Sequence, residues 1–202
     1  MAVSYDAIES CIEEAKTKDV LVYGNGLGKN NPQHTALLER LIALEIPLLI
    51  DGDGHHYLSR LRHKNLKTEH LIITPHSGEL EQCLTCASSV VDKDPLKAID
   101  KLAEWFKGVI VYKGPTTIIA QHQQKSFMID GSEALAKAGS GDVLAGIIAA
   151  LIGQKLDAYS AAEVGTMLQS KAVQYCLSTL TKESLMATDV IEAIAKTKLD
   201  DL

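Results

Sequence analysis

Four short apolar runs divide the first half of the chain: Val20–Tyr23, Leu48–Ile50, Leu71–Thr74 and Val109–Tyr112. Each is three or four residues long, rich in Val, Ile and Leu, and mostly lacks the alternation of apolar and polar residues seen in half-exposed strands. Continuous apolar runs of this length are typical of strands that are covered on both faces of a sheet. The runs therefore predict four buried strands.

Segments with helical periodicity separate these strands, and they cover Pro32–Leu44, the stretch around His55–Leu61, Gly78–Ala87 and Pro95–Phe106. Pro32 and Pro95 suit the first turn of a helix, where a missing N–H is not needed for a hydrogen bond. Strands that alternate with helices in this way predict parallel βαβ units.

The pattern changes after the fourth strand. Thr116–Gln121 and Ser126–Ile129 flank the polar His122–Lys125, which predicts an antiparallel hairpin. Further helices are predicted at both ends of the chain, over Met1–Asp19, Asp142–Gln154, Ala158–Leu177 and Thr188–Lys198. We therefore expect an α/β fold, a three-layer α/β/α sandwich with a mostly parallel central sheet and a helical C-terminal portion.

Length and composition predict one folded domain over residues 1–202, because 46% hydrophobic and 23% charged residues are ordinary values for a globular core of this size. The net charge of −6 gives no general attraction to nucleic acid or anionic lipid. Any phosphate must then be bound by local backbone amides and a few cations. Acidic residues throughout the N-terminal segment are unlike a signal peptide, and no apolar run reaches membrane-spanning length, so we expect a cytoplasmic protein.

The cysteines offer little evidence for a metal. Cys83-x-x-Cys86 stands without a second pair or a suitably spaced histidine, and Cys11 and Cys176 are isolated. We expect reduced thiols and no protein-held metal ion.

Polar motifs follow the first two strands. Gly24–Asn30 is a glycine-rich turn that satisfies neither the P-loop nor the GxGxxG pattern. It either makes room for a large ligand, which we favour, or simply joins a strand to a helix. In the second motif, Asp51–His56, we expect Asp51 or Asp53 to cap a turn and contact a substrate or a hydrated cation, since adjacent histidines rarely bind one metal together.

The third and fourth strands also end in polar residues. His76 follows a proline-stiffened turn, and Glu79 lies in the first turn of the next helix. Lys113 places a cation at the end of the fourth strand, and Gly114 leaves backbone amides open to a phosphate. A loop histidine and an exposed lysine without function are the alternatives. Ligands of parallel sheets bind at these strand ends, which favours a shared site.

The stretch Ala136–Gly146 has the layout of an anion site with a base beside it. Gly139 and Gly141 let backbone amides approach a ligand, and the helix that follows directs its positive end at the turn. Asp142 is poorly suited to bind phosphate itself, so it either takes a proton from the group being phosphorylated or caps the helix. The polar motifs that follow the four strands favour the first role for Asp142.

Together these motifs resemble the ADP/ATP-dependent NAD(P)H-hydrate dehydratases, a branch of the ribokinase-like superfamily and the C-terminal domain of many bifunctional nicotinamide nucleotide repair proteins. That family shows Gly-Pro-Gly-Leu-Gly, Asp-Ala-Asp-Gly-Leu-Asn, Thr-Pro-His-Pro-Gly-Glu, Lys-Gly followed by Thr, and Gly-Thr-Gly-Asp-Val-Leu-Ala-Gly. The corresponding segments here, in the same order, are Gly24–Gly28, Asp51–His56, Thr74–Glu79, Lys113–Thr117 and Gly139–Gly146. Leu185–Ile191 also resembles the end of the family's domain.

The resemblance implies dehydration of NADHX or NADPHX with ADP or ATP as phosphoryl donor, Mg²⁺ as cofactor, and a homo-oligomer. It implies that Asp142 is the base, with the amides of Gly139, Ser140 and Gly141 around the developing charge. The implied hydrate-binding residues are Gly26, Gly28, Asp53, His76, Glu79 and Asp142, and the implied nucleotide-binding residues are Lys113, Gly114, Pro115, Thr116, Thr117 and Gly141. A ribokinase-like small-molecule kinase and a non-catalytic nucleotide-binding module are the alternatives.

Several positions depart from the family's pattern. Asn25 and Ser77 replace prolines, His55 and His56 replace Leu-Asn, and Gln169 replaces a frequent histidine. We expect most of these to be peripheral to the chemistry. Relatives also carry several dozen residues before the first glycine turn, including a Gly-Ala-rich strand and helix, which this sequence lacks. A shortened N-terminus predicts either completion of the site by another subunit or segment, or a weakened or lost activity.

Overall fold

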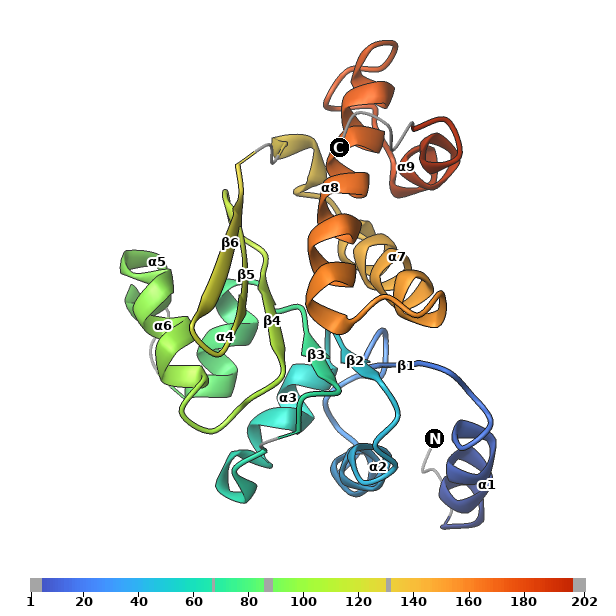
Figure 1. Ribbon diagram of the computed structural model, residues 1–202, viewed down its shortest axis with the longest axis vertical. Coiled ribbons are helices and arrows are strands. Elements are labelled where there is room, and N and C mark those ends of the chain that lie inside the picture. The colour runs from blue at the N-terminus through green and yellow to red at the C-terminus, as the bar shows by residue number, and fades with distance from the viewer. Residues whose placement is uncertain (1–4, 67, 86–88, 130–131, 198–202) are drawn as a thin grey trace.

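A six-stranded sheet forms the centre of the computed structural model, which describes residues 5–66, 68–85, 89–129 and 132–197 (Figure 1). Its strands lie in chain order: β1 (Leu21–Tyr23), β2 (Leu48–Ile50), β3 (Leu71–Ile73), β4 (Val109–Tyr112), β5 (Thr117–Gln121) and β6 (Gln124–Met128). The first four are parallel, and β5 and β6 form an antiparallel hairpin beside β4. The predicted mostly parallel sheet is confirmed.

Helices cover both faces of the sheet. Those of the first half are α1 (Tyr5–Ala15), α2 (Gln33–Ile42), α3 (Gly54–Ser59), α4 (Ser77–Leu84), α5 (Ser89–Lys93) and α6 (Pro95–Leu102). The second half contributes α7 (Ser140–Gly153), α8 (Ala158–Leu177) and α9 (Ala187–Ile194). Single 3₁₀ turns occur at Arg62–Lys64 and Glu133–Leu135.

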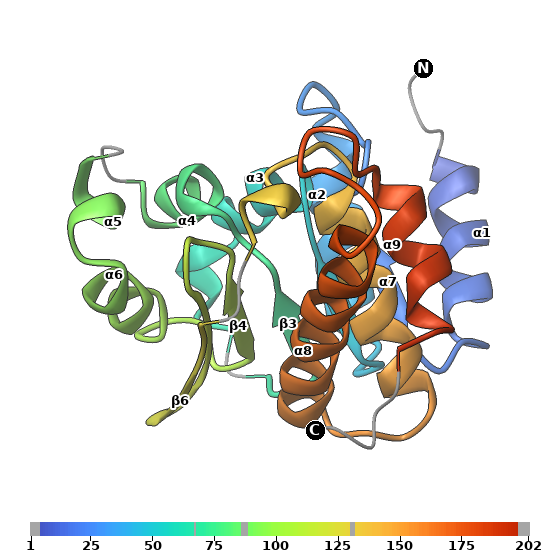
Figure 2. The ribbon, with the colours of Figure 1, turned by 90° about the horizontal axis from the view of Figure 1, so that it is seen from above.

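The strands alternate their side chains between two cores. Leu48 and Ile50 of β2 belong to a cluster with α1 to α4 and α6, whereas Leu49 belongs to a second cluster with α7 and α8. A third cluster joins α7, α8 and α9. Figure 2 shows α4 to α6 on one side of β3, β4 and β6, with α7 and α8 on the other. This confirms the α/β/α sandwich with a helical C-terminal portion.

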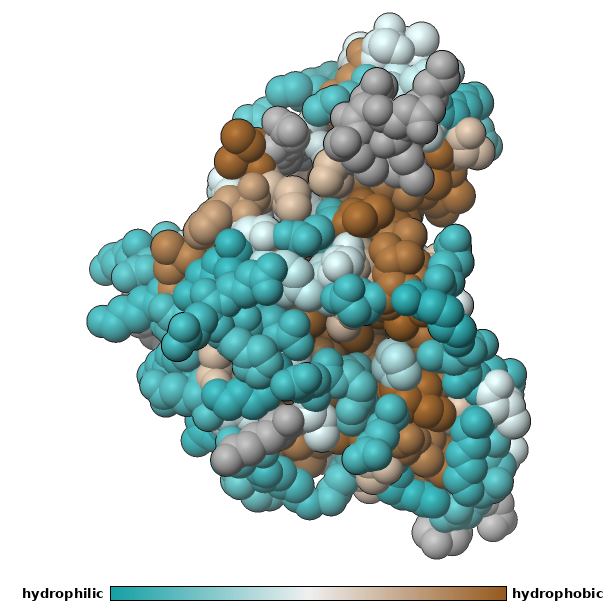
Figure 3. Space-filling model, viewed as in Figure 1, coloured by the Kyte–Doolittle hydropathy of each residue, from teal (hydrophilic) through white to brown (hydrophobic). Residues whose placement is uncertain are grey.

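Burial explains why the apolar runs identified the strands. Every residue of β2, β3 and β4 is buried. β1 is an edge strand in the described sheet, and its Val22 is 47% exposed. An apolar groove is lined mainly by α7, with Leu168 of α8 and Ile191 and Ile194 of α9. Figure 3 shows hydrophobic surface over the region of α7.

Several helix ends differ from the predicted ones, because the backbone conformation of a single residue determines where a helix begins or ends. Pro32 is the residue before α2 and not part of its first turn, while Pro95 begins α6 as expected. α4 ends at Leu84, because the next residue, Thr85, adopts a left-handed conformation that stops the helix. The short α5 was not predicted. The hairpin turn is tighter than predicted, because His122 adopts φ of +53° and β6 begins at Gln124.

Two expectations concern cysteines and membrane helices. Cys86 lies outside the described residues, and the other three cysteines are free thiols. Burial raises the pKa of the Cys83 thiol to about 12, which makes it a poor nucleophile or ligand. Within the described part of the chain, no helix has the length and apolarity needed to cross a bilayer.

Candidate active site

Asp142 lies in the first turn of α7 and does not cap it. The helix begins at Ser140, the preceding Gly139 adopts a left-handed conformation with φ of +87°, and no side chain caps the helix. Asp142 is the third helical residue and is exposed. The capping alternative is therefore wrong, and the carboxylate is available to a ligand beside the unpaired N–H groups of the helix start.

The turn before α7 is held by hydrogen bonds within its own segment and from α8. Ser140 Oγ donates to the carbonyl oxygens of Leu135 and Lys137, at 2.6 and 2.8 Å. Gln169 Nε2 of α8 donates to the Ser140 carbonyl oxygen at 2.8 Å. Ser140 N–H is engaged within the turn, since it donates to the Lys137 carbonyl oxygen at 3.3 Å. This leaves the amides of Gly139 and Gly141 better placed than that of Ser140 to bind an anion.

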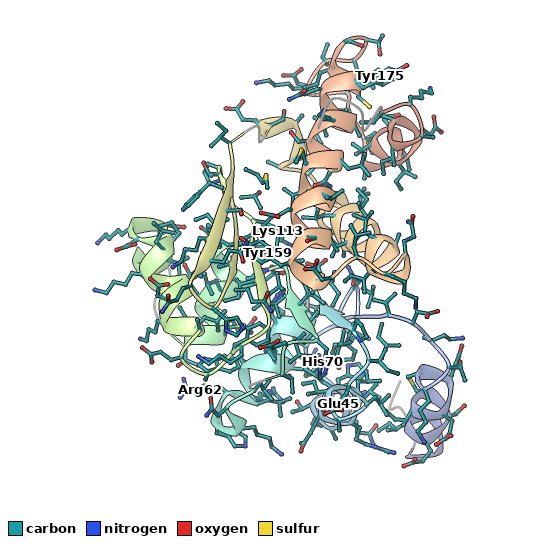
Figure 4. All side chains as sticks on the ribbon, viewed as in Figure 1. Glu45, Arg62, His70, Lys113, Tyr159 and Tyr175 are labelled. Atoms are coloured by element: carbon teal, nitrogen blue, oxygen red, sulfur yellow. The ribbon has the colours of Figure 1, made fainter. Side chains whose placement is uncertain are left out.

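A lysine lies directly against this turn. A Cβ atom added to Gly141 would stand 3.2 Å from Lys113 Nζ and 3.7 Å from Asp51 Oδ2. Lys113 follows β4, and Figure 4 labels it near the centre of the molecule, where the strands meet the helical portion. A side chain at position 141 would therefore contact the ammonium group, and Lys113 would have to shift slightly to admit it.

Asp51 and Lys113 form a largely buried ion pair. Lys113 Nζ donates to Asp51 Oδ1 at 2.8 Å, and Thr74 Oγ1 donates to the same oxygen at 2.6 Å. The Asp51 side chain is 3% exposed. Burial acts to raise the pKa of Asp51, but the charge of Lys113 and the two hydrogen bonds outweigh it and lower the pKa. Asp51 therefore stays ionised and fixes the position of Lys113.

Glu79 of α4 adds a second carboxylate beside the Asp51–Lys113 pair. Its carboxylate lies 3.8 Å from Lys113 Nζ and 3.7 Å from His55 Nδ1. Glu79 and His76 also form a capping box: the Glu79 carboxylate accepts from His76 N–H at 2.9 Å, and His76 Nδ1 accepts from Glu79 N–H at 3.3 Å. His55 is completely buried, and burial lowers its pKa. The imidazole of His55 is therefore neutral.

The glycine-rich turn after β1 borders Asp51. A Cβ atom on Gly24, whose φ is +123°, would stand 1.9 Å from the Asp51 carbonyl oxygen. Gly26 and Gly28 are exposed, and Gly28 N–H donates to Asp53 Oδ2 at 2.9 Å. Asp53 therefore holds the turn, whereas Asp51 lies beside Lys113.

Asn25 connects the turn to Asp142. Its Nδ2 donates to Asp51 Oδ2 at 3.0 Å and also to Asp142 Oδ1. We expected most departures from the family pattern to be peripheral to the chemistry. Two of them, Asn25 and Gln169, make hydrogen bonds to the first turn of α7. The pattern could mark these positions as unusual but gave no sign of their partners.

The remaining sequence-predicted residues lie beyond Lys113 in the chain. A Cβ atom on Gly114 would stand 2.7 Å from the Tyr112 ring, so this glycine permits close packing. Thr117 begins β5 and pairs with Met128. Within the described part of the chain, no hydrogen bond or ion pair joins Gly114, Pro115, Thr116 or Thr117 to Asp142. The structure thus brings together Asp142, Gly141, Lys113, Glu79, His76 and Asp51, and it adds Asn25 and Thr74.

This arrangement suits proton removal beside an anion. An exposed carboxylate stands at the positive end of a 14-residue helix, with an ammonium group against the same backbone turn. Helix dipole and ammonium both favour negative charge, while the carboxylate can accept a proton. Among the described residues, no group of three or more His, Cys, Asp or Glu side chains is arranged to hold a metal ion.

Sequence comparison with known proteins identifies a family. A family model described as NAD(P)H-hydrate dehydratase matches residues 1–196. The chain is 33% identical over 190 residues to the bifunctional NAD(P)H-hydrate repair enzyme Nnr of Escherichia coli, covering 94% of this chain and 36% of that protein. It is 31% identical to the Nnr protein of Vibrio cholerae, covering 95% and 38%. The chain thus spans somewhat more than a third of the length of these relatives.

Solved structures share the fold. The ADP/ATP-dependent NAD(P)H-hydrate dehydratase of Bacillus subtilis, co-crystallised with ATP and Mg²⁺, superposes with a TM-score of 0.76 at 20% identity, covering 92% of this chain and 68% of that one. At this identity the likeness shows a common α/β/α fold.

Proposed function

This chain belongs to the NAD(P)H-hydrate dehydratase family, and we propose that it converts NADHX and NADPHX to NADH and NADPH at the expense of ADP or ATP. The observation that carries the proposal is the exposed Asp142 carboxylate in the first turn of α7, beside Lys113 and the Gly139–Gly141 turn. The names of the relatives support the substrate, and the co-crystallised Bacillus structure supports the nucleotide.

Asp142 acts as the base in the first step. It takes the proton of the ring hydroxyl while the hydroxyl oxygen bonds to the terminal phosphorus of the nucleotide, and the bond from that phosphorus to its bridging oxygen breaks. AMP leaves from ADP, or ADP from ATP. The amides of Gly139 and Gly141 and the ammonium of Lys113 favour the negative charge on the phosphoryl oxygens.

Elimination completes the reaction without a redox change. Phosphate is a better leaving group than hydroxide, so the lone pair of the ring nitrogen expels it from the carbon that carried the hydroxyl. The adjacent ring carbon then loses a proton, which restores the dihydropyridine. The protein must hold the ring still and keep water away from the activated phosphoryl group, which is the task of the loops around Asp142.

We assign the nucleotide and the hydrate to different residues around Asp142. We place the nucleotide against Gly141 and the segment from Lys113 through Gly114, Pro115 and Thr116 to Thr117. The hydrate faces the exposed turn of Gly26 and Gly28, held by Asp53, and the His76–Glu79 pair at the start of α4. These roles agree with the exposure of the turn and of His76.

Mg²⁺ fits this site as a partner of the phosphates. Because the described side chains form no three-ligand cage, the ion would be held chiefly by phosphate oxygens and water, with Asp142 as a nearby carboxylate. When bound, it supplies charge neutralisation to the polyphosphate. We further propose that residues 1–202 act as one domain and assemble as a homo-oligomer.

An assay of purified protein with each hydrate, ADP or ATP, and Mg²⁺ tests the function. Recovery of absorbance at the wavelength of reduced nicotinamide, with one phosphate released per turnover, is the expected result. Asp142→Asn should lower kcat at least about 10³-fold. Asp19→Asn, an exposed aspartate paired with Lys155, is the matched control and should not change the rate.

Three outcomes count against the proposal. A stable phosphorylated alcohol without phosphate release indicates a small-molecule kinase. Nucleotide binding without turnover of any hydrate, under conditions in which a full-length relative is active, indicates a binding module. Unchanged turnover in Asp142→Asn excludes this residue as the base.

A further inference from the structure

The Asn25 carboxamide touches two carboxylates from different elements. One nitrogen, Nδ2, donates to Asp51 at the end of β2 and to Asp142 in the first turn of α7. An amide nitrogen carries two N–H groups, so it can serve both acceptors at once. A single side chain therefore joins the exposed carboxylate of α7 to the buried ion pair of Asp51 and Lys113.

The backbone turn does not itself require asparagine. Leu27 N–H donates to the Gly24 carbonyl oxygen at 3.3 Å, and Gly26 in third position has φ of +67°, so Asn25 occupies the second position of a β-turn. With a left-handed third residue, this second position also suits proline. The distinctive contribution of Asn25 is therefore its side chain.

Asp51 is a fixed anchor, whereas Asp142 has few restraints of its own. Asp51 is buried and accepts hydrogen bonds from Lys113 and Thr74 on its other oxygen. Asp142 is exposed, and within the described part of the chain Asn25 is the side chain that donates to it. A general base must lie within hydrogen-bond reach of its proton, and an error of about 1 Å can cost about 100-fold in rate.

We propose that Asn25 is a positioning residue: it links Asp142 Oδ1 to the Asp51–Lys113 pair, so that the other oxygen of Asp142 is presented to the substrate hydroxyl. This proposal rests on the proposed function for its catalytic consequence. The bridge itself is a property of the free protein and can be tested without substrate.

Two substitutions separate the side chain from the turn. Asn25→Pro keeps the turn and removes both donors. Asn25→Asp has almost the same shape but places a third carboxylate against Asp51 and Asp142. We expect kcat to fall about 10-fold in Asn25→Pro and about 100-fold in Asn25→Asp, with KM for both substrates within about threefold. Asn65→Asp, at an exposed asparagine after the 3₁₀ turn Arg62–Lys64, is the matched charge control and should retain wild-type kcat.

Thermal unfolding without ligands tests the bridge independently of catalysis. Asn25→Asp should lower Tm more than Asn25→Pro does, and part of that loss should disappear when Asp142→Asn removes one of the repelling carboxylates. If the Tm change of Asn25→Asp is the same with Asp142 and with Asn at that position, the bridge is absent and the proposal is overturned.

The kinetic outcomes are equally decisive. Wild-type kcat in Asn25→Asp, or a changed KM with an unchanged kcat in both variants, overturns the positioning role. Failure of the wild type to convert either hydrate refutes the proposed function instead, and the Tm comparison then still decides whether Asn25 holds Asp142.

Discussion

Lys113→Met isolates the contribution of the buried ion pair. Methionine has nearly the length of lysine but no charge, so Asp51 keeps its hydrogen bonds from Thr74 and Asn25 and loses its ionic partner at 2.8 Å. Removing one partner of a buried pair costs about 3–5 kcal/mol. Because the Lys113 side chain is 22% exposed, we expect the lower end, about 3 kcal/mol.

Urea and thermal unfolding at pH 7 measure this loss. For a domain of this size, about 3 kcal/mol corresponds to a fall in Tm of roughly 6–12 °C. Lys16→Met, which removes an exposed pair with Glu13, is the control and should leave the unfolding midpoint unchanged. A loss below about 1 kcal/mol in Lys113→Met would mean that the pair contributes no more than a surface contact.

The pH dependence gives a second check. In the wild type the pKa of Asp51 is lowered, so its stabilisation is present above the ordinary aspartate pKa and is lost as pH falls through the lowered value. Without Lys113, burial acts to raise the pKa of Asp51, and protonation relieves the unpaired charge. The stability difference between wild type and Lys113→Met should therefore shrink as pH falls from 7 toward 5. A constant difference over that range refutes the reasoning.

Three other substitutions follow from the packing of the site. Gly24→Ala places a Cβ atom 1.9 Å from the Asp51 carbonyl oxygen and should cost more than about 3 kcal/mol in urea unfolding; a wild-type midpoint contradicts this. Gly141→Ala contacts Lys113 Nζ at 3.2 Å, so Tm should change little while kcat falls about 10-fold or more; unchanged turnover contradicts it. Gln169→Leu loses a 2.8 Å hydrogen bond to the turn before α7, which should cost about 1 kcal/mol in urea unfolding; no loss contradicts it.

Local patterns were sufficient to predict most of the fold. The runs Leu48–Ile50 and Val109–Tyr112 coincide with β2 and β4, because a strand covered on both faces has apolar residues at every position. Helix ends were less accurate because they depend on single backbone angles, such as the left-handed Thr85 after α4. The five-residue α5 was missed because so short a segment contains too little periodicity.

The site required contacts between distant parts of the chain. The resemblance located Asp142 and Lys113, but 117 residues separate Asn25 from Asp142 and 62 separate Asp51 from Lys113. Nothing local distinguishes Asp51 from Asp53, which both follow β2. Their roles differ only because Asp51 lies beside Lys113 and Thr74, while Asp53 accepts from the glycine turn.

The charge balance of the site predicts how the nucleotide binds. Asp51, Glu79 and Asp142 stand against one lysine, and burial keeps His55 neutral, so the group is negative even with the positive end of α7 beside it. A polyphosphate adds further negative charge. We therefore expect the affinity for ATP, measured by calorimetry, to fall at least about 10-fold when Mg²⁺ is replaced by a chelator, and Asp142→Asn to reduce that dependence by removing one of the repelling charges. Equal affinity with and without Mg²⁺ would mean that the polyphosphate lies away from these carboxylates, because repulsion at close range would lower the affinity for ATP without Mg²⁺.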